Sequence, residues 1–266
     1  MSRLDEAFRQ ARAQGRAAFI PYLTAGFPDP DGFLELARDL LEVADVLEVG
    51  LPYSDPLGDG PTIQRSSERA LKQGVSTETT MALIKELRRN SDRPIVCMTY
   101  YNPIYCCKGG ERGFLEALKR SGADGVILPD LPPDEAGTLI GIARELAVDT
   151  IFLIAPTTTE ARLKLVTEAC RGFVYAVSVT GVTGARETLP EDVVDLVARA
   201  RAASPLPVAV GFGIASARTA KAVAEVADGV VVGSALVTAA ERGGARELAT
   251  ELAAACLRPR NRQGAT

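Results

Sequence analysis

The sequence predicts an α/β protein, a closed (β/α)8 barrel with an additional N-terminal helix. Eight short runs of apolar and β-branched residues recur along the 266-residue chain, and segments with one apolar face at helical spacing follow them. Alternation of strands and helices indicates a parallel sheet, and eight such units in about 250 residues match the closed barrel better than an open doubly wound sheet. The open sheet stays an alternative, although no GxGxxG motif follows the first run.

The elements follow one another in a regular order. Residues 1–19 form a charged amphipathic segment, which predicts a helix and not a signal peptide. Strands are predicted at 18–23, 46–50, 94–100, 125–130, 150–155, 173–178, 207–212 and 229–234. Helices are predicted after them, for instance at 31–43, 109–122, 160–170 and 217–227. Asp29 before Pro30, and Pro61 further on, are typical of helix starts.

A faint internal repeat fits a βα unit that has been repeated. The segments 43–50, 122–130 and 226–234 each lead into a predicted strand through the dipeptide Ala-Asp. No low-complexity linker divides the chain, so residues 1–266 are expected to form a single barrel domain. Only the tail at 258–266 lies outside this pattern, and it is expected to be flexible.

The composition narrows the range of functions. The net charge is −4, and the chain has no dense basic run, which argues against nucleic acid or an anionic membrane as the main partner. No stretch approaches the roughly 20 apolar residues of a membrane span. The five cysteines are odd in number and irregular in spacing, so a reducing cytoplasm is the simplest location.

Histidine is absent, which restricts the chemistry. A His-based triad is impossible, and the commonest transition-metal ligand is missing, so no metal is expected. If the chain is an enzyme that works by proton transfer, its acid and base must be carboxylate, tyrosine, lysine or cysteine.

Glu48 places a carboxylate inside the apolar run at 46–50. Alternate residues of a barrel strand face the interior, so Leu47 and Val49 are expected to face the helices. Val46, Glu48 and Gly50 then face inward, near the carboxyl end of the strand, where active sites of this fold gather. A buried carboxylate is unfavourable unless it is paired or functional. Glu48 is therefore either a structural residue tied to an arginine or to backbone amides, or a functional acid.

A second acid follows on the loop after the same strand. Asp59 lies in "PLGDGPT", where it could cap the helix that Pro61 begins. Its position over the same barrel mouth as Glu48 favours a functional carboxylate instead. Tyr175 lies on the sixth predicted strand, where packing inside the barrel and a role in the site are equally good interpretations.

Three later loops are small and rich in glycine, at 180–184, 211–213 and 232–235. Glycine lets backbone amides approach an anion closely, and this fold commonly binds phosphate with the loops after strands 7 and 8. A small phosphate ester is the expected ligand. The six lysines fall in helical segments or, for Lys108, in a loop, which argues against a Schiff-base aldolase. What remains is metal-free acid–base chemistry by Glu48 and Asp59.

At this point the sequence resembles a known family, the alpha chain of tryptophan synthase, over nearly its whole length. The most specific motif is "LEVGLPYSDPLGDGPTIQ" at 47–64. The others are "PYLTAGFPD" (21–29), "MTYYNPI" (98–104), "GADGVILPDLPPDE" (122–135), "SVTGVTGAR" (178–186), "VGFGIA" (210–215) and "DGVVVGSA" (228–235). The resemblance implies a TIM barrel that cleaves indole-3-glycerol phosphate to indole and D-glyceraldehyde 3-phosphate.

The resemblance also implies roles for single residues. Glu48 and Asp59 correspond to the catalytic pair, and Tyr175 to an assisting tyrosine. The implied phosphate site consists of Gly184, Gly213, Gly233 and Ser234, and the expected indole pocket includes Tyr22, Tyr100 and Phe212. Asp55, Pro132 and Thr183 are expected to take part in loop closure or in contact with a partner. That partner is a beta chain, which carries pyridoxal phosphate and receives indole in an alpha2beta2 complex, whereas this chain should carry no cofactor.

Departures from the family pattern are small. Tyr53 stands where the family often has Phe, and Val179-Thr180 replaces an Arg-Ser pair, which affects loop closure more than chemistry. Alternatives are a free-standing indole-3-glycerol phosphate lyase, another phosphate-binding barrel of the same pathway, and a catalytically dead subunit that only activates a partner. The absence of a strand-end lysine argues against a ring-closing synthase, and retention of Glu48, Asp59 and Tyr175 argues against a dead subunit.

Overall fold

Eight parallel strands close into a barrel in the computed structural model, which describes residues 1–177, 189–211 and 213–258. Each strand pairs with the next in chain order, and β8 pairs with β1, so the open-sheet alternative is wrong. The strands are β1 (Ala18–Thr24), β2 (Leu47–Gly50), β3 (Ile95–Met98), β4 (Gly125–Leu128), β5 (Asp149–Ile154), β6 (Val174–Val177), β7 (Val208–Gly211) and β8 (Gly229–Val232). All eight predicted strands are confirmed, with ends that shift by a few residues.

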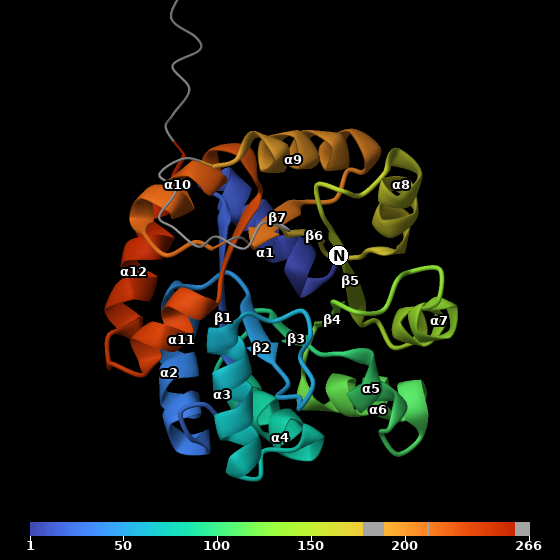
Figure 1. Ribbon diagram of the computed structural model, residues 1–266, viewed down its shortest axis with the longest axis vertical. Helices are drawn as coiled ribbons and strands as arrows, with labels where there is room; N and C mark the ends of the chain where they lie inside the picture. The colour runs from blue at the N-terminus through green and yellow to red at the C-terminus, as the bar shows by residue number, and fades with distance from the viewer. Residues whose placement is uncertain (178–188, 212, 259–266) are drawn as a thin grey trace, which may run out of the picture.

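Helices form a ring outside the barrel (Figure 1). Those in the first half are α1 (Arg3–Ala13), α2 (Pro30–Val43), α3 (Pro61–Lys72), α4 (Thr77–Arg88), α5 (Tyr101–Tyr105) and α6 (Gly110–Ser121). Those in the second half are α7 (Gly137–Glu145), α8 (Glu160–Ala169), α9 (Glu191–Ala203), α10 (Ala217–Val226), α11 (Ser234–Ala240) and α12 (Ala245–Ala255). In the described part of the chain, no helix combines the length and apolar character needed to cross a membrane.

Local signals explain where several helices begin and end. The Asp29 side chain accepts a hydrogen bond from the Gly32 amide at 2.8 Å, which caps α2, and Pro30 is its first residue. The prediction of one helix over residues 1–19 is wrong at its end. The chain leaves α1 after Ala13 and turns at Gly15, whose φ of +70° is easy for glycine, before it enters β1.

The core has two layers, as the alternation in β2 predicts. Leu47 and Val49 pack outward in the large cluster between strands and helices, whereas Val46 packs inside the barrel. The inner cluster also includes Ile20, Val96, Ile127, Ile151, Ala209 and Val231. Because each strand gives alternate residues to each layer, Glu48 faces the interior.

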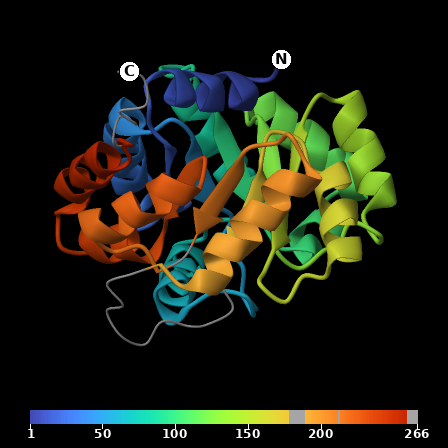
Figure 2. The same ribbon diagram turned by 90° about the horizontal axis from the view of Figure 1, so that it is seen from above.

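Helix α1 closes one end of the barrel (Figure 2). Its buried face, Leu4, Ala7, Phe8 and Ala11, packs against the inner cluster, and the Phe8 and Phe173 rings lie 5.4 Å apart between centroids. The start of α3 lies at the opposite end, where the carboxyl ends of the strands form the mouth. The additional N-terminal helix that the sequence predicts is therefore a plug at the amino-terminal end of the strands.

The Ala-Asp repeat has a structural meaning at this closed end. In each repeat the aspartate precedes a strand, accepts a hydrogen bond from the backbone amide at the start of the strand before it in the barrel, and pairs with an arginine. These strand-start aspartates are Asp45, Asp124 and Asp228. Their amide donors are Phe19, Ile95 and Val208, and their arginine partners are Arg16, Arg88 and Arg201, in the same order. Each one fixes neighbouring strands together, so the repeat serves stability.

The expected flexible tail at 258–266 lies outside the described residues except for Arg258. Its guanidinium donates to the carbonyls of Ala224 and Ala227 and lies 3.7 Å from the Asp228 carboxylate. The chain is therefore anchored to the closed end of the barrel as far as Arg258.

Candidate active site

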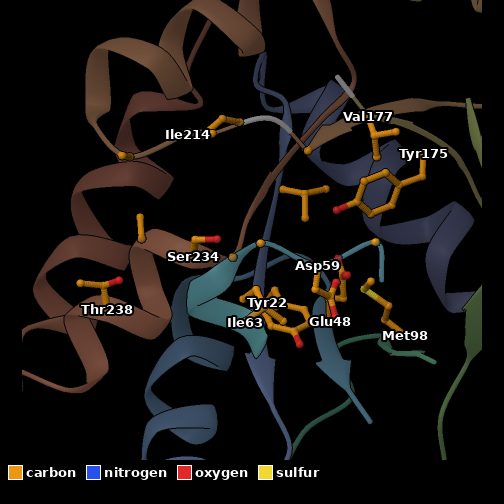
Figure 3. Close-up of a pocket in the computed structure, with 18 of the residues that line it drawn as sticks. Tyr22, Glu48, Asp59, Ile63, Met98, Tyr175, Val177, Ile214, Ser234 and Thr238 are labelled. Carbon is orange, nitrogen blue, oxygen red and sulfur yellow. The ribbon is translucent and has the colours of Figure 1, made fainter. Parts of the chain in front are cut away.

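A cavity of about 920 Å³ opens at the carboxyl ends of the strands (Figure 3). It is lined by groups from most of the barrel, which is why no single stretch of sequence defines it. The predicted site residues in its wall are Tyr22, Glu48, Asp59, Tyr175, Gly213, Gly233 and Ser234. The fold therefore brings together residues that are up to 212 positions apart, as between Tyr22 and Ser234.

The Glu48 side chain is buried, with 1% of its surface exposed. Its Oε2 atom has no hydrogen-bond partner among the described residues, and none of the ion pairs they form involves it. The interpretation of Glu48 as a structural residue tied to an arginine or to amides therefore finds no support. Burial, with a smaller contribution from the nearby charge of Asp59, raises the pKa of Glu48 to about 8. Glu48 is thus neutral at pH 7 and holds a proton that it can give away.

Asp59 does not cap the helix that follows it. The N-cap of α3 is Gly60, and no side chain caps this helix, so the capping interpretation is wrong. The loop is held by the Asp59 amide, which donates to Pro56, and by Gln64, whose side chain donates to the Asp59 carbonyl at 2.9 Å. Burial raises the pKa of Asp59 to about 6, and a hydrogen bond from Tyr100 opposes this rise. Asp59 is therefore ionised at pH 7 beside a neutral Glu48.

Tyr175 enters the cavity from β6. A Cβ on Gly211 of the adjacent strand β7 would lie 2.5 Å from the Tyr175 phenolic oxygen, so only glycine leaves room for this ring. Burial, followed by the charge of Glu48, raises the pKa of Tyr175 well above its usual value. The phenol is a neutral hydrogen-bond donor at any pH of interest.

The three aromatic residues expected around an indole differ in position. Tyr22 lines the cavity from β1. Tyr100 supports the Asp59 loop from behind, since its hydroxyl accepts a hydrogen bond from the Gly58 amide at 3.0 Å. Phe212 lies outside the described residues. The sequence did not separate the wall residue Tyr22 from the supporting residue Tyr100, because both follow the same pattern of an aromatic residue near a strand end.

The glycine-rich backbone after β7 and β8 also lines the cavity. Gly213 has a φ of +41°, which favours glycine, and Gly233 precedes the first residue of α11, Ser234. Two other predicted site residues, Thr183 and Gly184, lie outside the described residues. Two glycine-containing segments therefore line the same cavity as the carboxylates of β2 and its loop.

Sequence reasoning missed the apolar wall of the cavity and one cation. The wall includes Ile63, Met98, Ile127, Leu153, Val177 and Ile214. The period-2 pattern of strands could have identified Met98 and Leu153. Arg242, on the turn after α11, also lines the cavity, and nothing in the local sequence indicates this. The described residues contain no group of three or more Cys, Asp or Glu side chains arranged to hold a metal ion.

Asp55 and Pro132, two of the residues expected to contact a partner, lie on the loops after β2 and β4. Asp55 is exposed and accepts a hydrogen bond from Ser54 at 2.6 Å. Pro132 lines a separate hollow of about 340 Å³ between the loops after β4 and β5. Two large apolar side chains nearby are exposed, Leu57 at 94% and Tyr105 at 68%. Leu57 lies on the loop after β2 and Tyr105 is the last residue of α5, so both side chains are accessible to a partner.

A closed barrel of eight parallel strands, with two carboxylates and two phenols in the cavity at its mouth, defines a TIM-barrel protein. The sequence model of the family described as the tryptophan synthase alpha chain matches residues 8–263. The chain therefore belongs to the tryptophan synthase alpha chain family, lyases of tryptophan biosynthesis.

Relatives and solved structures agree with this assignment. The tryptophan synthase alpha chain of Deinococcus radiodurans is 55% identical over 260 residues, which cover 97% of this chain and 96% of the relative. A structure of Mycobacterium tuberculosis tryptophan synthase superposes with a TM-score of 0.90 at 44% identity and covers 97% of this chain and 99% of that one. A structure of the tryptophan synthase a2b2 complex of Pyrococcus furiosus gives a TM-score of 0.83 at 45% identity, with 89% and 97% covered.

Proposed function

We propose that this chain cleaves indole-3-glycerol phosphate to indole and D-glyceraldehyde 3-phosphate in a retro-aldol reaction driven by general acid/base catalysis without a metal. The observation that carries the proposal is the pairing of a neutral, unpartnered Glu48 with an ionised Asp59 in one cavity. A buried acid and a nearby base with separated pKa values are the usual arrangement for proton transfer near neutral pH.

The bond changes assign a role to each group. Glu48 gives its proton to the indole ring carbon that carries the side chain, which places positive charge on the ring nitrogen. The carboxylate of Asp59 stabilises this charge through the ring N–H. Glu48, now ionised, takes the proton of the adjacent side-chain hydroxyl. The carbon–carbon bond then breaks, its electron pair returns to the ring, and indole and an aldehyde result.

The remaining groups bind and orient the substrate. The apolar wall with Met98, Ile127 and Leu153 suits a planar aromatic ring. The backbone at Gly213, Gly233 and Ser234 suits the phosphate, since glycine lets amides approach an anion closely. Tyr175 lines the same cavity and is a donor that can assist Glu48.

A beta chain is the proposed partner, in an alpha2beta2 complex like that of the Pyrococcus furiosus relative. Exposed Leu57 and Tyr105 and the carboxylate of Asp55 would form the docking face around the mouth. Indole would pass to the beta chain there, and pyridoxal phosphate would belong to that chain. Five free cysteines fit a reducing cytoplasm as the location.

The experiment is direct. The pure chain is incubated with indole-3-glycerol phosphate, and release of indole and glyceraldehyde 3-phosphate is measured with and without a beta chain. Glu48→Gln keeps the size of the side chain but removes proton transfer, so turnover should fall roughly 10²-fold or more while substrate binding changes little. Glu35→Gln makes the same chemical change on the exposed face of α2 and should leave turnover unaltered.

Three outcomes would contradict the proposal in whole or in part. Retention of more than about a tenth of the turnover by Glu48→Gln would remove Glu48 from the chemistry. Absence of cleavage by the unaltered chain, even with a beta chain present, would favour a subunit that only activates its partner. Equal turnover with and without a beta chain would favour a free-standing lyase over a subunit.

A further inference from the structure

A chain of buried hydroxyl groups connects Tyr22 in the cavity wall to helix α3. The Tyr22 phenolic oxygen lies 3.2 Å from Thr24 Oγ1, which lies 2.6 Å from Ser66 Oγ. Ser66 Oγ donates to the Ile63 carbonyl at 2.8 Å. Tyr22 is 6% exposed, and Thr24 and Ser66 are fully buried.

The direction of every hydrogen in this chain follows from its last member. A carbonyl oxygen can only accept, so the single hydroxyl hydrogen of Ser66 points to Ile63. Thr24 must then donate to Ser66, because Ser66 has no second hydrogen to give. Thr24 has in turn no hydrogen left, so Tyr22 donates to Thr24. The phenolic hydrogen of Tyr22 therefore points away from the cavity, and its free lone pair is an acceptor.

Glu48, whose Oε2 atom has no hydrogen-bond partner among the described residues, lines the same cavity as this acceptor. Tyr22 and Glu48 are register partners on the adjacent strands β1 and β2, and both side chains line the cavity (Figure 3). The Tyr22 oxygen lies over Gly50, where an added Cβ would be only 2.1 Å away. Gly50 follows Glu48 by two residues on the same face of β2, about 6.6 Å along the strand. A glutamate side chain that leans along the strand can reach this position.

Tyr175 has the opposite hydrogen-bond character. Among the described residues no acceptor engages its hydroxyl, which opens into the cavity, so its hydrogen is free to point to a carboxylate. The two phenols that face Glu48 are therefore not equivalent. One can only accept a hydrogen bond from within the cavity, and the other can donate one.

We propose that Tyr22 is a positioning residue for Glu48: its phenolic oxygen accepts the hydrogen bond of the protonated carboxyl, and Tyr175 donates to the carboxylate after the proton has left. This inference rests on the proposed function of Glu48 as acid and then base. Each protonation state of Glu48 then has its own partner. Transfer of the proton moves the side chain from the Tyr22 oxygen toward Tyr175 and the substrate hydroxyl.

Few groups near Glu48 can titrate or carry a charge. Tyr22 comes from β1, Cys97 from β3, Tyr175 from β6 and Asp59 from the loop after β2, and each interacts electrostatically with Glu48. Arg242 lines the same cavity. Cys97 faces the outer layer, and burial raises its pKa to about 12, so it stays neutral. Of the two phenols in this set, Tyr22 is the one whose hydrogen is already directed to another acceptor.

The test measures the pKa of Glu48 in the substrate-free protein by 13C NMR of labelled glutamate, with Glu48→Gln to assign the signal. Tyr22→Phe removes the acceptor of the neutral acid and should lower this pKa by about half to one unit. Thr24→Val leaves the phenol without an acceptor, so its hydrogen turns to the cavity and stabilises the carboxylate. This variant should therefore lower the pKa of Glu48 further than Tyr22→Phe does. Adding Thr24→Val to Tyr22→Phe should have no additional effect.

A second variant and a control separate this inference from a merely structural role. Ser66→Ala frees Thr24 to donate to Tyr22 and should act in the same direction as Thr24→Val. Thr150→Val removes an equally buried hydroxyl on β5, which donates to Ala169 at 2.9 Å, and should leave the pKa unchanged. An unchanged pKa in Tyr22→Phe, or a rise in Thr24→Val, would overturn the proposal.

The activity readout distinguishes failure of the inference from failure of the proposed function. In Tyr22→Phe the alkaline limb of kcat/KM should move toward acid by the same half to one unit, whereas KM at pH 6 stays unchanged. If the natural chain cleaves the substrate and the alkaline limb does not move in Tyr22→Phe, the role of Tyr22 is wrong and the proposed function still stands. A natural chain without cleavage would overturn the proposed function, and the NMR titration would still decide whether Tyr22 partners Glu48.

Discussion

Tyr100 and Asp59 form a unit that ties the loop after β2 to the start of α5. The Tyr100 hydroxyl accepts from the Gly58 amide at 3.0 Å and donates to the Asp59 carboxylate. The first contact holds the loop in place, and the second keeps the pKa of Asp59 lower than burial alone would allow. One phenol therefore sets both the position and the charge of this acid.

The pH dependence of kcat/KM should be bell-shaped. Asp59 must be ionised, so activity is expected to fall below about pH 6, and Glu48 must be protonated, so activity is expected to fall above about pH 8. The apparent pKa values of the two limbs describe the interacting pair of Glu48 and Asp59 together. Tyr100→Phe removes a hydrogen bond that favours the carboxylate, so the acid limb should move upward by about half a unit or more. A profile that is flat between pH 5 and 9 would contradict both assignments.

Glu48→Gln should stabilise the ligand-free protein, increasingly so at higher pH. The pKa of Glu48 is raised from 4.5 in the unfolded chain to about 8 in the fold, so the folded state binds more protons between these values. The free energy of unfolding of the natural chain therefore falls as pH rises through this range, and glutamine removes that loss. At about 1.4 kcal/mol per unit of pKa shift, roughly 2 kcal/mol or more should separate the two proteins at pH 8.

Urea denaturation at pH 5 and pH 8 measures this difference. Glu35→Gln, an exposed change of the same kind, should show the same difference from the natural chain at both pH values. A Glu48→Gln variant that is less stable than the natural chain at pH 8 would mean that the carboxylate has a stabilising partner.

Gly233→Asp should abolish binding of a glycerol phosphate analogue by charge. The atoms nearest to a Cβ at Gly233 belong to Tyr22 and lie at 3.5 Å or more, which is ordinary contact, so a side chain can begin there and the fold should survive. Gly233→Asn has the same size without the charge. Calorimetry should therefore show a much larger loss of affinity for Asp than for Asn. Equal losses would indicate a steric effect, and equal affinity in all three proteins would place the phosphate elsewhere.

Ligand binding and docking of a beta chain should be coupled, because both use the loops at the mouth. A bound analogue should tighten beta-chain binding, and the beta chain should tighten analogue binding by the same factor, typically about 5–150-fold. Asp55→Ala should reduce this factor more than it reduces analogue affinity in the isolated chain. Asp31→Ala, an exposed aspartate at the start of α2, should leave the factor unchanged. Identical affinities with the other ligand absent and saturating would mean no coupling.

Particular residues show what could be predicted from the sequence. The strands were recognisable because parallel strands buried on both faces form continuous apolar runs, and Glu48 stood out as a charge within one of them. The predicted strand at 94–100 is longer than β3, because Tyr100 already caps α5. The sequence alone could not decide whether Asp59 caps α3, because this depends on the geometry of the loop. The hydrogen bonds that connect Tyr22, Thr24 and Ser66 could not be predicted from the sequence, because they join β1 to α3 across 44 positions.

Side chains of the inner cluster fill the barrel below the cavity, and α1 covers its amino-terminal end, so this end is closed. With Phe8 and Phe173 packed across its floor, the described structure leaves the mouth as the route for everything that enters or leaves the cavity. A protein docked over that mouth would then decide the fate of the products as well as the entrance of the substrate. An apolar product would have either the lumen of the docked protein or the gap at its rim as an exit. Tightness of the seal, and not only the rate of cleavage, would set how much product is lost to the surrounding water.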